Sequence, residues 1–224
     1  MFKIIISTTL LSAVLLATST LKTAKQKASY TIGIQLGTQL MISKDDIDLD
    51  AMKMGMQNIF SGKKPRLSND EMRQAMMDFQ EKKSLREVAM TKKMSAFNKK
   101  EGQTYLKMNK KKKGVITLKS GLQYKVLKSG KGKSPKLTDT VVTNYHGTLI
   151  NGTVFDSSYD RGQSVSFPVN AVIKGWTQAL MKMKVGDKWE LVIPSNLAYG
   201  EQGAPPKITP GATLIFIIEL VEIK

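Results

Sequence analysis

The spacing of apolar residues divides the chain into a first half with helical periodicity and a second half with strand periodicity. In residues 28–62 apolar side chains recur every three or four positions, as in Ile32, Leu36 and Leu40, which predicts two short helices. After Gly114 apolar and polar residues alternate instead, which predicts strands. The pattern therefore indicates the α+β class, with an all-α N-terminal domain and a C-terminal antiparallel sheet.

A long helix is predicted between these two halves. Ser68 and Glu71 form the S-x-x-E pattern of a capping box, so the helix is expected to begin there. Apolar residues become sparse along it, and a helix that is polar nearly all round usually bridges domains through solvent. Residues 68–114 are therefore expected to be an exposed linking helix, with Gly102 as a point of flexure and Gly114 as its end.

The C-terminal half contains one helical stretch, residues 173–183, among several alternating runs. An Asn-Gly pair at positions 151–152 stands between two such runs and predicts a hairpin. The clearest runs are residues 122–126, 141–145, 189–193 and 214–220. Together they predict an antiparallel sheet wrapped on a short helix, in a domain of residues 115–224.

The first residues have the pattern of a secretory signal peptide. Lys3 supplies a positive charge, and an apolar stretch of residues 4–16 follows it. The small residues Ala17 and Ser19 fit a cleavage site, so residues 1–19 are expected to be removed on export. The apolar stretch is too short to span a bilayer comfortably, which makes a retained anchor the less favoured alternative.

The two short helices of residues 28–67 are expected to form a homodimer. They are rich in methionine, a residue that suits adaptable apolar interfaces. About 35 residues in two short helices cannot enclose a core by themselves. A second copy of the chain is the simplest cover for their apolar faces.

The composition excludes several kinds of chemistry. There is no Cys among the 224 residues, which excludes disulfides, thiolate catalysis and Cys-based metal sites. The presence of a single histidine, His146, argues against a His-rich metal site or a Ser-His-Asp triad. We expect neither a metal nor a cofactor.

The net charge of +17 is concentrated in the first half of the chain. Residues 1–114 contain 22 Lys and Arg against 10 Asp and Glu. Such an excess could attract polyanions or a membrane surface weakly, but a solvated lysine-rich helix explains it more simply. Aromatic residues do not alternate with the basic runs, so no nucleic-acid partner is expected.

An apolar, aromatic set of short motifs fills the second half. In chain order they are NYHGTL, GTVFDSSYDRG, VIKGW, AYG and PGATLIFIIEL, which lie between residues 144 and 220. Only one acid, Asp156, lies inside the FDSS element. The inventory fits a pocket that binds an apolar ligand with few polar groups, rather than a site with a nucleophile.

The order and spacing of these motifs closely resemble FKBP-type peptidyl-prolyl cis/trans isomerases over residues 115–224. The segments YTIGIQLGTQL, DLDAMKMGMQNIFSGK and LSNDEMRQAMMDFQ, which lie within residues 30–80, resemble the N-terminal domain of macrophage infectivity potentiator (Mip) proteins and related periplasmic FKBPs. The resemblance implies an exported, dimeric isomerase of a bacterial periplasm, outer membrane or cell surface. It also implies proline-containing polypeptides as substrates, chaperone activity, and rapamycin-like macrolides as inhibitors.

The same resemblance implies a role for individual residues. Trp176 would be the pocket floor under the proline ring, and Asp156 would be the polar group near the substrate carbonyl. The Tyr199 hydroxyl and the backbone N–H of Ile173 would donate to substrate carbonyls. The catalytic set would be Asp156, Tyr199 and Phe155. The substrate-binding set would be Tyr145, Arg161, Val172, Ile173, Trp176, Ile208 and Phe216.

Other prominent residues of this half are expected to have structural roles. The core is expected to contain Phe167, Leu191 and Leu214, and backbone turns are expected at Gly147, Gly175 and Gly200. Strand alternation places His146 on the face opposite Tyr145, as an exposed residue. Departures from the commonest family pattern occur at Val165, Ala204 and Lys207, so substrate preference and macrolide fit are open. The alternative function is a non-catalytic protein that binds proline-containing segments or surfaces and attaches through its basic N-terminal half.

Overall fold

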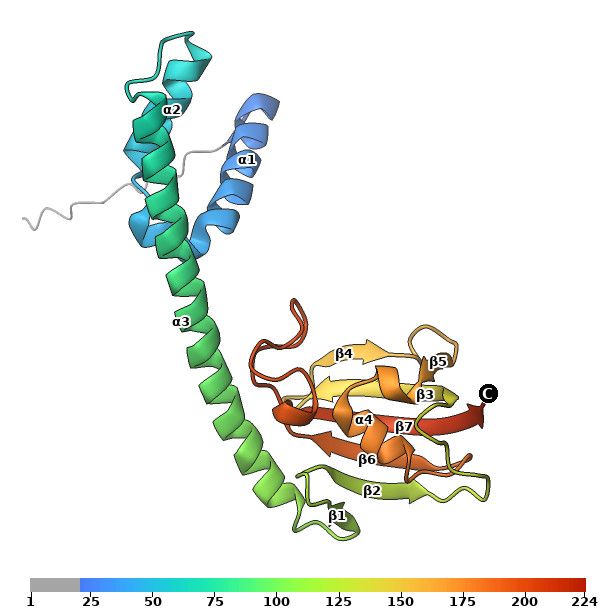
Figure 1. Cartoon of the computed structure of the whole chain (residues 1–224). Helices are drawn as coiled ribbons and strands as arrows, with labels where there is room; N and C mark the ends of the chain where they lie inside the picture. Colours follow the sequence, from blue (N-terminus) through green and yellow to red (C-terminus); the bar gives the residue numbers. More distant parts are fainter. Residues whose placement is uncertain (1–20) are drawn as a thin grey trace, which may run out of the picture. The chain divides into compact units, whose positions relative to one another are not determined.

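The computed structural model describes residues 21–224, so the expected signal peptide lies outside the described residues. The chain divides into two compact units, with the boundary between Phe79 and Gln80. The first unit is helical, and the second contains the sheet (Figure 1). Within residues 21–224, none of the helices is long and apolar enough to cross a membrane.

The N-terminal unit is built from helices whose ends carry the expected capping residues. It contains α1 (Ala24–Leu40), the 3₁₀ helix η1 (Met41–Asp46), α2 (Leu49–Phe60) and the start of α3 (Asn69–Asn109). Capping satisfies backbone N–H groups that the first helical turn leaves free.

Three side chains provide these caps. Thr23 accepts a hydrogen bond from the N–H of Gln26, and Asp48 caps α2. The predicted capping box before α3 is present: Ser68 Oγ accepts from the N–H of Glu71, whose carboxylate accepts from the N–H of Ser68 at 2.8 Å.

The apolar faces of α1 and α2 are uncovered in the single chain. Neither helix contains a buried residue. A groove of about 730 Å³ lies among α1, η1 and α2, and Ile32, Leu36, Met52 and Met56 are among its lining residues. The Phe60 side chain at its edge is 86% exposed. Within residues 21–79, no hydrophobic residue is fully buried.

The C-terminal unit is an antiparallel sheet with one short helix against one of its faces (Figure 1). Its strands run in the spatial order β1-β2-β6-β7-β3-β4, and β5 also pairs with β3. The strands are β1 (Val115–Thr117), β2 (Gln123–Lys128), β3 (Thr140–Leu149), β4 (Val154–Ser157), β5 (Val165–Pro168), β6 (Lys188–Ile193) and β7 (Leu214–Ile223). The helical elements are η2 (Val169–Ala171), α4 (Lys174–Leu180) and η3 (Ser195–Leu197). The fold class expected from the sequence is confirmed.

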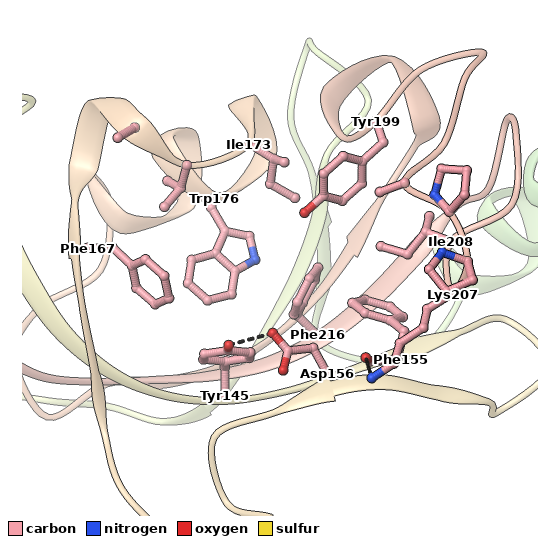
Figure 2. Close-up of a pocket in the computed structure, with 15 residues that line it drawn as sticks. Tyr145, Phe155, Asp156, Phe167, Ile173, Trp176, Tyr199, Lys207, Ile208 and Phe216 are labelled. Atoms are coloured by element: carbon pink, nitrogen blue, oxygen red, sulfur yellow. Dashed lines mark hydrogen bonds between the residues drawn. The ribbon is translucent and has the colours of Figure 1, made fainter. Parts of the chain in front are cut away.

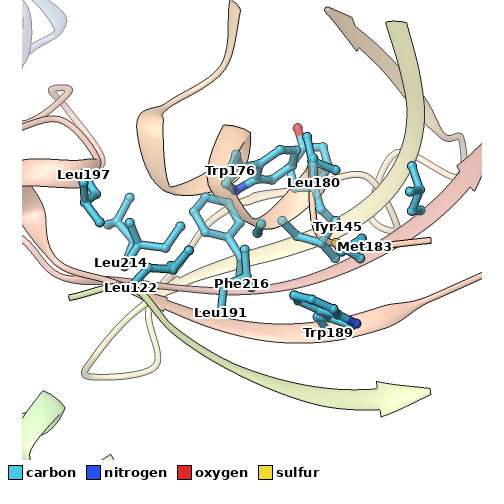
Figure 3. Packing of buried hydrophobic residues seen from close by; sticks show 14 of the residues in the cluster. Leu122, Tyr145, Trp176, Leu180, Met183, Trp189, Leu191, Leu197, Leu214 and Phe216 are labelled. Carbon is cyan, nitrogen blue, oxygen red and sulfur yellow. The ribbon is translucent and has the colours of Figure 1, made fainter. Parts of the chain in front are cut away.

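The core of this unit lies between α4 and the sheet (Figure 3). Leu180 and Met183, on and just after α4, are fully buried, as are Leu122 and Leu191 on the sheet side. Burial of such side chains from both layers provides the main stabilising contribution, at roughly 1.5–3 kcal/mol each. Leu191 and Leu214 are core residues, as the sequence predicts.

The local turn predictions match, and one helix is shorter than expected. The predicted hairpin is present between β3 and β4: the N–H of Gly152 donates to the carbonyl of Leu149, so Ile150 and Asn151 are the central turn residues, and Gly152 follows them with a φ of +86°. Helix α4 covers Lys174–Leu180 rather than residues 173–183. The periodic apolar residue Met183 continues to face the core, although it follows the helix.

Helix α3 differs from the exposed linker that the sequence predicts. Within the C-terminal unit its last turns are packed, and Ser95, Gly102 and Asn109 are buried. The Asn109 amide donates to the side-chain oxygen of Gln123 at 2.9 Å, and the Gln123 amide donates to the carbonyl of Leu106 at 3.0 Å. These polar partners make no apolar stripe, so hydrophobic periodicity does not reveal the contact.

Gly102, within α3, and Gly114, after its end, also have roles other than those expected. The helix ends at Asn109, and Gly114, with a φ of +82°, lies in the turn before β1. Gly102 is no point of flexure, because a Cβ atom there would lie 2.1 Å from Thr213 Oγ1. It is the position at which the helix backbone comes close to the start of β7.

Candidate functional site

A pocket of about 520 Å³ opens between α4, the sheet and the segment after Tyr199 (Figure 2). Six of its lining residues are aromatic, and Asp156 is the acid among them. The lining residues are Tyr145, Phe155, Asp156, Phe167, Ala171, Val172, Ile173, Trp176, Tyr199, Ala204, Pro205, Pro206, Lys207, Ile208 and Phe216. The site is apolar and concave, as small-molecule and peptide sites usually are.

Trp176, on the first turn of α4, is the centre of the aromatic packing. Its side chain is almost fully buried, and only 4% of the residue is exposed. Its indole ring meets three other rings edge to face or nearly so, at centroid distances of 5.1–5.6 Å: Tyr145, Phe167 and Phe216. Aromatic pairs in this geometry attract one another beyond their area of burial. The ring is therefore held rigidly at the base of the pocket.

The sheet provides space for the rings through a glycine. Gly147 of β3 pairs with Asp156 of β4 on one side and Phe216 of β7 on the other. A Cβ atom there would lie 2.7 Å from the Phe155 ring and 2.8 Å from the Phe216 ring. Gly147 thus serves close packing and not a turn, which corrects the sequence-based expectation.

Of the other two glycines for which a turn is expected, Gly175 serves close packing and Gly200 lies in a turn. Gly175 lies inside α4, where a Cβ atom would lie 2.5 Å from the Ile193 side chain. It allows α4 to approach the sheet, so the expected turn is absent there too. Gly200, with a φ of +61°, is the turn glycine that the sequence predicts.

The FDSS element fixes Asp156 at the pocket wall. Ser158 is fully buried, and its Oγ accepts a hydrogen bond from the N–H of Tyr145 at 2.8 Å. The N–H of Ser158 donates to the carbonyl of Tyr145 at 2.9 Å. These bonds tie the residues after Asp156 to β3. Ser158 is therefore a positioning residue, a role that the motif alone does not reveal.

Asp156 accepts hydrogen bonds from two side chains. The Tyr145 hydroxyl donates to Asp156 Oδ2 at 2.6 Å, and Arg161 forms an ion pair with Asp156 Oδ1. Arg161 Nη2 also donates to the Tyr145 hydroxyl at 2.6 Å. The three groups form a closed network in which the carboxylate is acceptor only.

The network keeps the acid ionised and the tyrosines protonated. Partial burial acts to raise the pKa of Asp156, but the hydrogen bonds from Tyr145 and Arg161 outweigh it and lower the pKa below its ordinary value. Burial, and then the hydrogen bond to Asp156, raise the pKa of Tyr145. Burial, and then the charge of Asp156, raise the pKa of Tyr199. No group in the network is ready to exchange a proton near neutral pH.

Several hydrogen-bond donors at the pocket have no partner within the described residues, among them the buried Trp176 Nε1. Tyr199 lines the pocket, is 42% exposed, and its hydroxyl makes no hydrogen bond to residues 21–224. The backbone N–H of Ile173, the residue before α4, has no partner there either. Both could donate to carbonyl groups of a bound peptide.

The segment after Tyr199 forms the rim of the pocket. Ala204 and Ile208 pair through two backbone hydrogen bonds of 2.9 and 3.0 Å, so the turn between them is a small closed loop. Lys207 on this turn reaches across the site, and its Nζ donates to the backbone carbonyl of Phe155 at 3.0 Å. A cation therefore lies at the mouth of an otherwise apolar pocket.

The pocket brings together nine of the ten residues that the resemblance assigns to the site. Arg161 is the exception, since it does not line the pocket and contacts it through Asp156 and Tyr145. Phe167, expected in the core, is only partly buried: it packs against the core cluster and also lines the pocket. Its ring lies 5.6 Å from the Trp176 ring and 5.9 Å from the Tyr145 ring, which are also in the pocket lining.

Several lining residues were not singled out by sequence reasoning. These are Ala171, Pro205 and Pro206, whose small or rigid side chains carry no chemistry of their own. His146 lies on the sheet face opposite Tyr145, as expected, but it is half-buried and not exposed. Among residues 21–224, no group of three His, Asp or Glu side chains could hold a metal ion.

Two family models match the chain. The model described as FKBP-type peptidyl-prolyl cis-trans isomerase matches residues 131–221. The model described as the domain amino terminal to FKBP-type peptidyl-prolyl isomerase matches residues 25–126. The sheet, its helix and the aromatic pocket therefore define an FKBP-type domain that follows a helical N-terminal domain.

Relatives match over nearly the whole chain. Peptidyl-prolyl cis-trans isomerase Mip of Coxiella burnetii is 46% identical over 93% of this chain and 90% of its own length. The FKBP-type 22 kDa peptidyl-prolyl cis-trans isomerase of Escherichia coli is 44% identical over 93% of this chain and 100% of its own. The crystal structure of FkpA from Escherichia coli matches with a TM-score of 0.70 and 40% identity, over 91% of this chain and 98% of that one. The chain belongs to the FKBP-type peptidyl-prolyl cis/trans isomerases and is Mip-like.

Proposed function

We propose that this FKBP-type isomerase binds the X–Pro bond of its substrates in the pocket at Trp176. The observation that supports the proposal best is the aromatic pocket itself, in which six rings surround a rigid floor and Asp156 is the acid. A proline ring is compact and apolar and fits over an indole face. A peptide chain brings its carbonyl groups to two of the unpartnered donors, the Tyr199 hydroxyl and the N–H of Ile173.

Rotation of an X–Pro bond needs no proton transfer and no covalent intermediate. The uncatalysed barrier is about 18–20 kcal/mol, because rotation removes the resonance of the amide. The enzyme lowers it by binding the twisted amide more tightly than the planar one. An apolar site favours this, since water stabilises the polar, planar resonance form and the rings exclude water. A site whose ionisable groups each keep one protonation state near neutral pH suits such a reaction.

The individual roles that we propose are supported by the positions of the side chains. Trp176 is the floor under the proline ring, and Tyr145, Phe155 and Phe216 are the walls around it. Val172, Ile173 and Ile208 contribute apolar contacts to the flanking residues. Asp156, oriented by Arg161, is the fixed negative group beside the rotating carbonyl carbon, and Phe155 is the ring next to it.

An isomerase assay tests this proposal directly. The purified chain should accelerate both the isomerisation of a prolyl tetrapeptide and the proline-limited refolding of a protein. Trp176→Leu should weaken binding of prolyl ligands in parallel with the loss of activity. Binding of prolyl peptides without any acceleration would instead support the alternative of a non-catalytic proline-binding protein.

A homodimer through the N-terminal unit is the second part of the proposal. The apolar groove of about 730 Å³ among α1, η1 and α2, with exposed residues such as Ile32 and Phe60, supports it. The match of residues 25–126 to the domain amino terminal to FKBP-type isomerases is consistent with it. A second copy would cover surface that a stable soluble protein rarely leaves exposed.

Export, chaperone activity and macrolide binding complete the proposal. A relative at 41% identity, from Legionella longbeachae, carries the name outer membrane protein MIP, which supports a location in the periplasm or at the outer membrane. Proline-containing exported polypeptides would then be the substrates, with unfolded ones as chaperone clients. Rapamycin-like macrolides would compete for the Trp176 pocket. Contact of the lysine-rich first half with polyanions or membrane surfaces would be weak and salt-sensitive.

A further inference from the structure

The last turns of α3 contact the segment that carries the rim of the pocket. We call residues 200–213 the rim loop, since Ala204 to Ile208 within it line the pocket. Asn98 of α3 donates through its Nδ2 to Thr209 Oγ1 at 2.9 Å and to the carbonyl of Pro210 at 2.8 Å. One side chain of the helix is thus bound at two points of the rim loop.

The helix and the rim loop also interlock at two glycines. A Cβ atom at Gly102 of α3 would lie 2.1 Å from Thr213 Oγ1, and one at Gly211 of the rim loop would lie 2.5 Å from the carbonyl oxygen of Ser95. Ser95 itself is 3% exposed. At Gly211 the rim-loop backbone meets the helix backbone, and at Gly102 the helix backbone meets the Thr213 side chain, so neither position has room for a side chain.

The remaining contact is weaker. Lys99 forms an ion pair with Glu201, but both side chains are more than a third exposed. Pairs at such exposure contribute about 0–1 kcal/mol. Asn98, which is half-buried, and the two glycines are therefore the stronger determinants of where the rim loop lies.

Hydrogen bonds inside the rim loop connect the anchored residues Thr209 and Pro210 to residues that line the pocket. The N–H of Gly211 donates to the carbonyl of Gly200 at 2.9 Å, next to Tyr199. Ile208, the neighbour of Thr209, pairs with Ala204 and lines the pocket. A displacement at the anchored end would therefore move both Tyr199 and the Ala204–Ile208 turn.

We propose that α3 is part of the substrate site and that Asn98 is a positioning residue for the rim loop. The inference rests on the proposed use of the Trp176 pocket for X–Pro substrates. Asn98 touches no substrate, and it acts through Thr209 and Pro210 on the side chains that do. The ordinary alternative is that α3 merely covers one edge of the sheet domain and contributes stability alone.

The test compares variants of the full chain. Asn98→Ala removes both hydrogen bonds, Asn98→Asp keeps the shape but removes the amide donor, and Thr209→Val removes one acceptor. Gln103→Ala is the matched control, because Gln103 lies on the same helix and is exposed. Each variant is measured for kcat and KM on a prolyl tetrapeptide, for melting temperature, and for amide exchange at Ala204 and Ile208.

We expect Asn98→Ala and Asn98→Asp to lower kcat/KM about 3–10-fold, mostly through a higher KM, with faster exchange at both amides. KM should change because the rim loop contacts planar and twisted substrate alike. Thr209→Val should have a smaller effect, and Gln103→Ala none. A loss confined to kcat and accompanied by a lower melting temperature would overturn the proposal, as would unchanged kinetics. If the wild-type chain showed no isomerase activity, the proposed function would fail, but the exchange measurement would still test the anchoring of the rim loop by Asn98. Faster amide exchange in Asn98→Ala would support that anchoring, and unchanged exchange would refute it.

Discussion

At the scale of single residues, the site depends on a carboxylate whose protonation state is fixed by its neighbours. Tyr145 and Arg161 satisfy Asp156 from two sides, and Ser158 of the FDSS element holds the strand that carries it. The pocket therefore presents an ionised carboxylate, paired with Arg161, beside apolar rings. Catalysis by differential binding needs such a fixed arrangement more than it needs a reactive group.

The first prediction concerns the polar residues of the pocket. Asp156→Ala and Tyr199→Phe should each lower kcat/KM about 3–10-fold or more, since each removes a polar contact to the substrate. Both side chains are more than 40% exposed, so the fold should survive. A protease-coupled tetrapeptide assay with circular dichroism as the folding control decides this. Full activity in both variants would refute the site assignment.

The second prediction concerns pH. Because the pKa of Asp156 is lowered and those of Tyr145 and Tyr199 are raised, kcat/KM should stay level from about pH 6 to 9. The stability that Asp156 contributes is present above the ordinary Asp range and is lost as the pH falls through its lowered pKa. Asp156→Asn should therefore flatten the acid limb of a melting-temperature profile. A change of kcat/KM with pH near neutrality would contradict the view that rotation of the X–Pro bond involves no proton transfer.

The third prediction concerns Lys207, whose charge lies across the mouth of the pocket. Lys207→Met should bind a rapamycin-like macrolide more tightly than wild type, because an apolar rim residue replaces an ammonium group that must lose water. Lys182→Met, an equal loss of charge at an exposed position after α4, is the control. Calorimetric titration measures both. Equal affinities for wild type and Lys207→Met would contradict the prediction. They would show that the Lys207 ammonium group leaves the mouth of the pocket without a loss of binding free energy.

At the scale of elements, α3 belongs to the catalytic unit through its last turns. Sequence alone places the domain boundary at residue 115, where strand periodicity begins. Gln123, on β2, is buried, and both ends of its side-chain amide form hydrogen bonds with α3. Its oxygen accepts from the Asn109 amide, and its nitrogen donates to the carbonyl of Leu106. A domain cut at residue 115 loses both hydrogen bonds, each of which contributes about 0.5–1.5 kcal/mol, and exposes the surface that the helix covers.

The fourth prediction follows from this contact. A fragment of residues 80–224 should be monomeric and as active on a tetrapeptide as the full chain. A fragment of residues 115–224 should unfold at lower denaturant concentration and have a higher KM, since the rim loop loses Asn98 and the fit at Gly102. Urea melts and steady-state kinetics of the two fragments compare them. Identical behaviour would mean that α3 contributes nothing to the domain.

At the scale of the whole molecule, the two units differ in how they bury hydrophobic side chains. The C-terminal unit encloses its own core, whereas neither α1 nor α2 contains a buried residue. Apolar residues are exposed on the N-terminal unit at helical spacing, so the exposed face is continuous. Assembly with a second copy is the physical solution that we propose.

The fifth prediction tests that assembly. Light scattering of the chain without residues 1–19 should give the mass of a dimer, and Leu36→Asp with Phe60→Asp should give a monomer with unchanged tetrapeptide kinetics. Phe97→Asp, a charge at an exposed aromatic residue of the other unit, should leave the dimer intact. The monomer should be less effective on unfolded proteins, which can engage two sites of a dimer. A monomeric wild-type chain would refute the dimer.

Features that depend on neighbouring residues could be predicted from the sequence alone. Helical spacing, the Ser68–Glu71 capping box, the Asn-Gly turn and the alternating strands are local patterns, and the structure contains all of them. The pocket motifs are recognisable because each is a short run of unusual residues. Most residues of the pocket could therefore be named from these motifs, with their roles implied by the resemblance.

Contacts between residues far apart in the chain follow only from the three-dimensional fold. Periodicity tells which face of an element is apolar, but it does not tell what lies against that face. The contact of Asn98 with the rim loop, the position of Phe167 in the pocket and the close approaches at Gly102 and Gly147 all join such distant residues. Asn98 is polar, Gly102 and Gly147 have no side chain, and Phe167 resembles any other apolar residue of a strand. No local sequence pattern therefore distinguishes them. Close packing in three dimensions gives them their function.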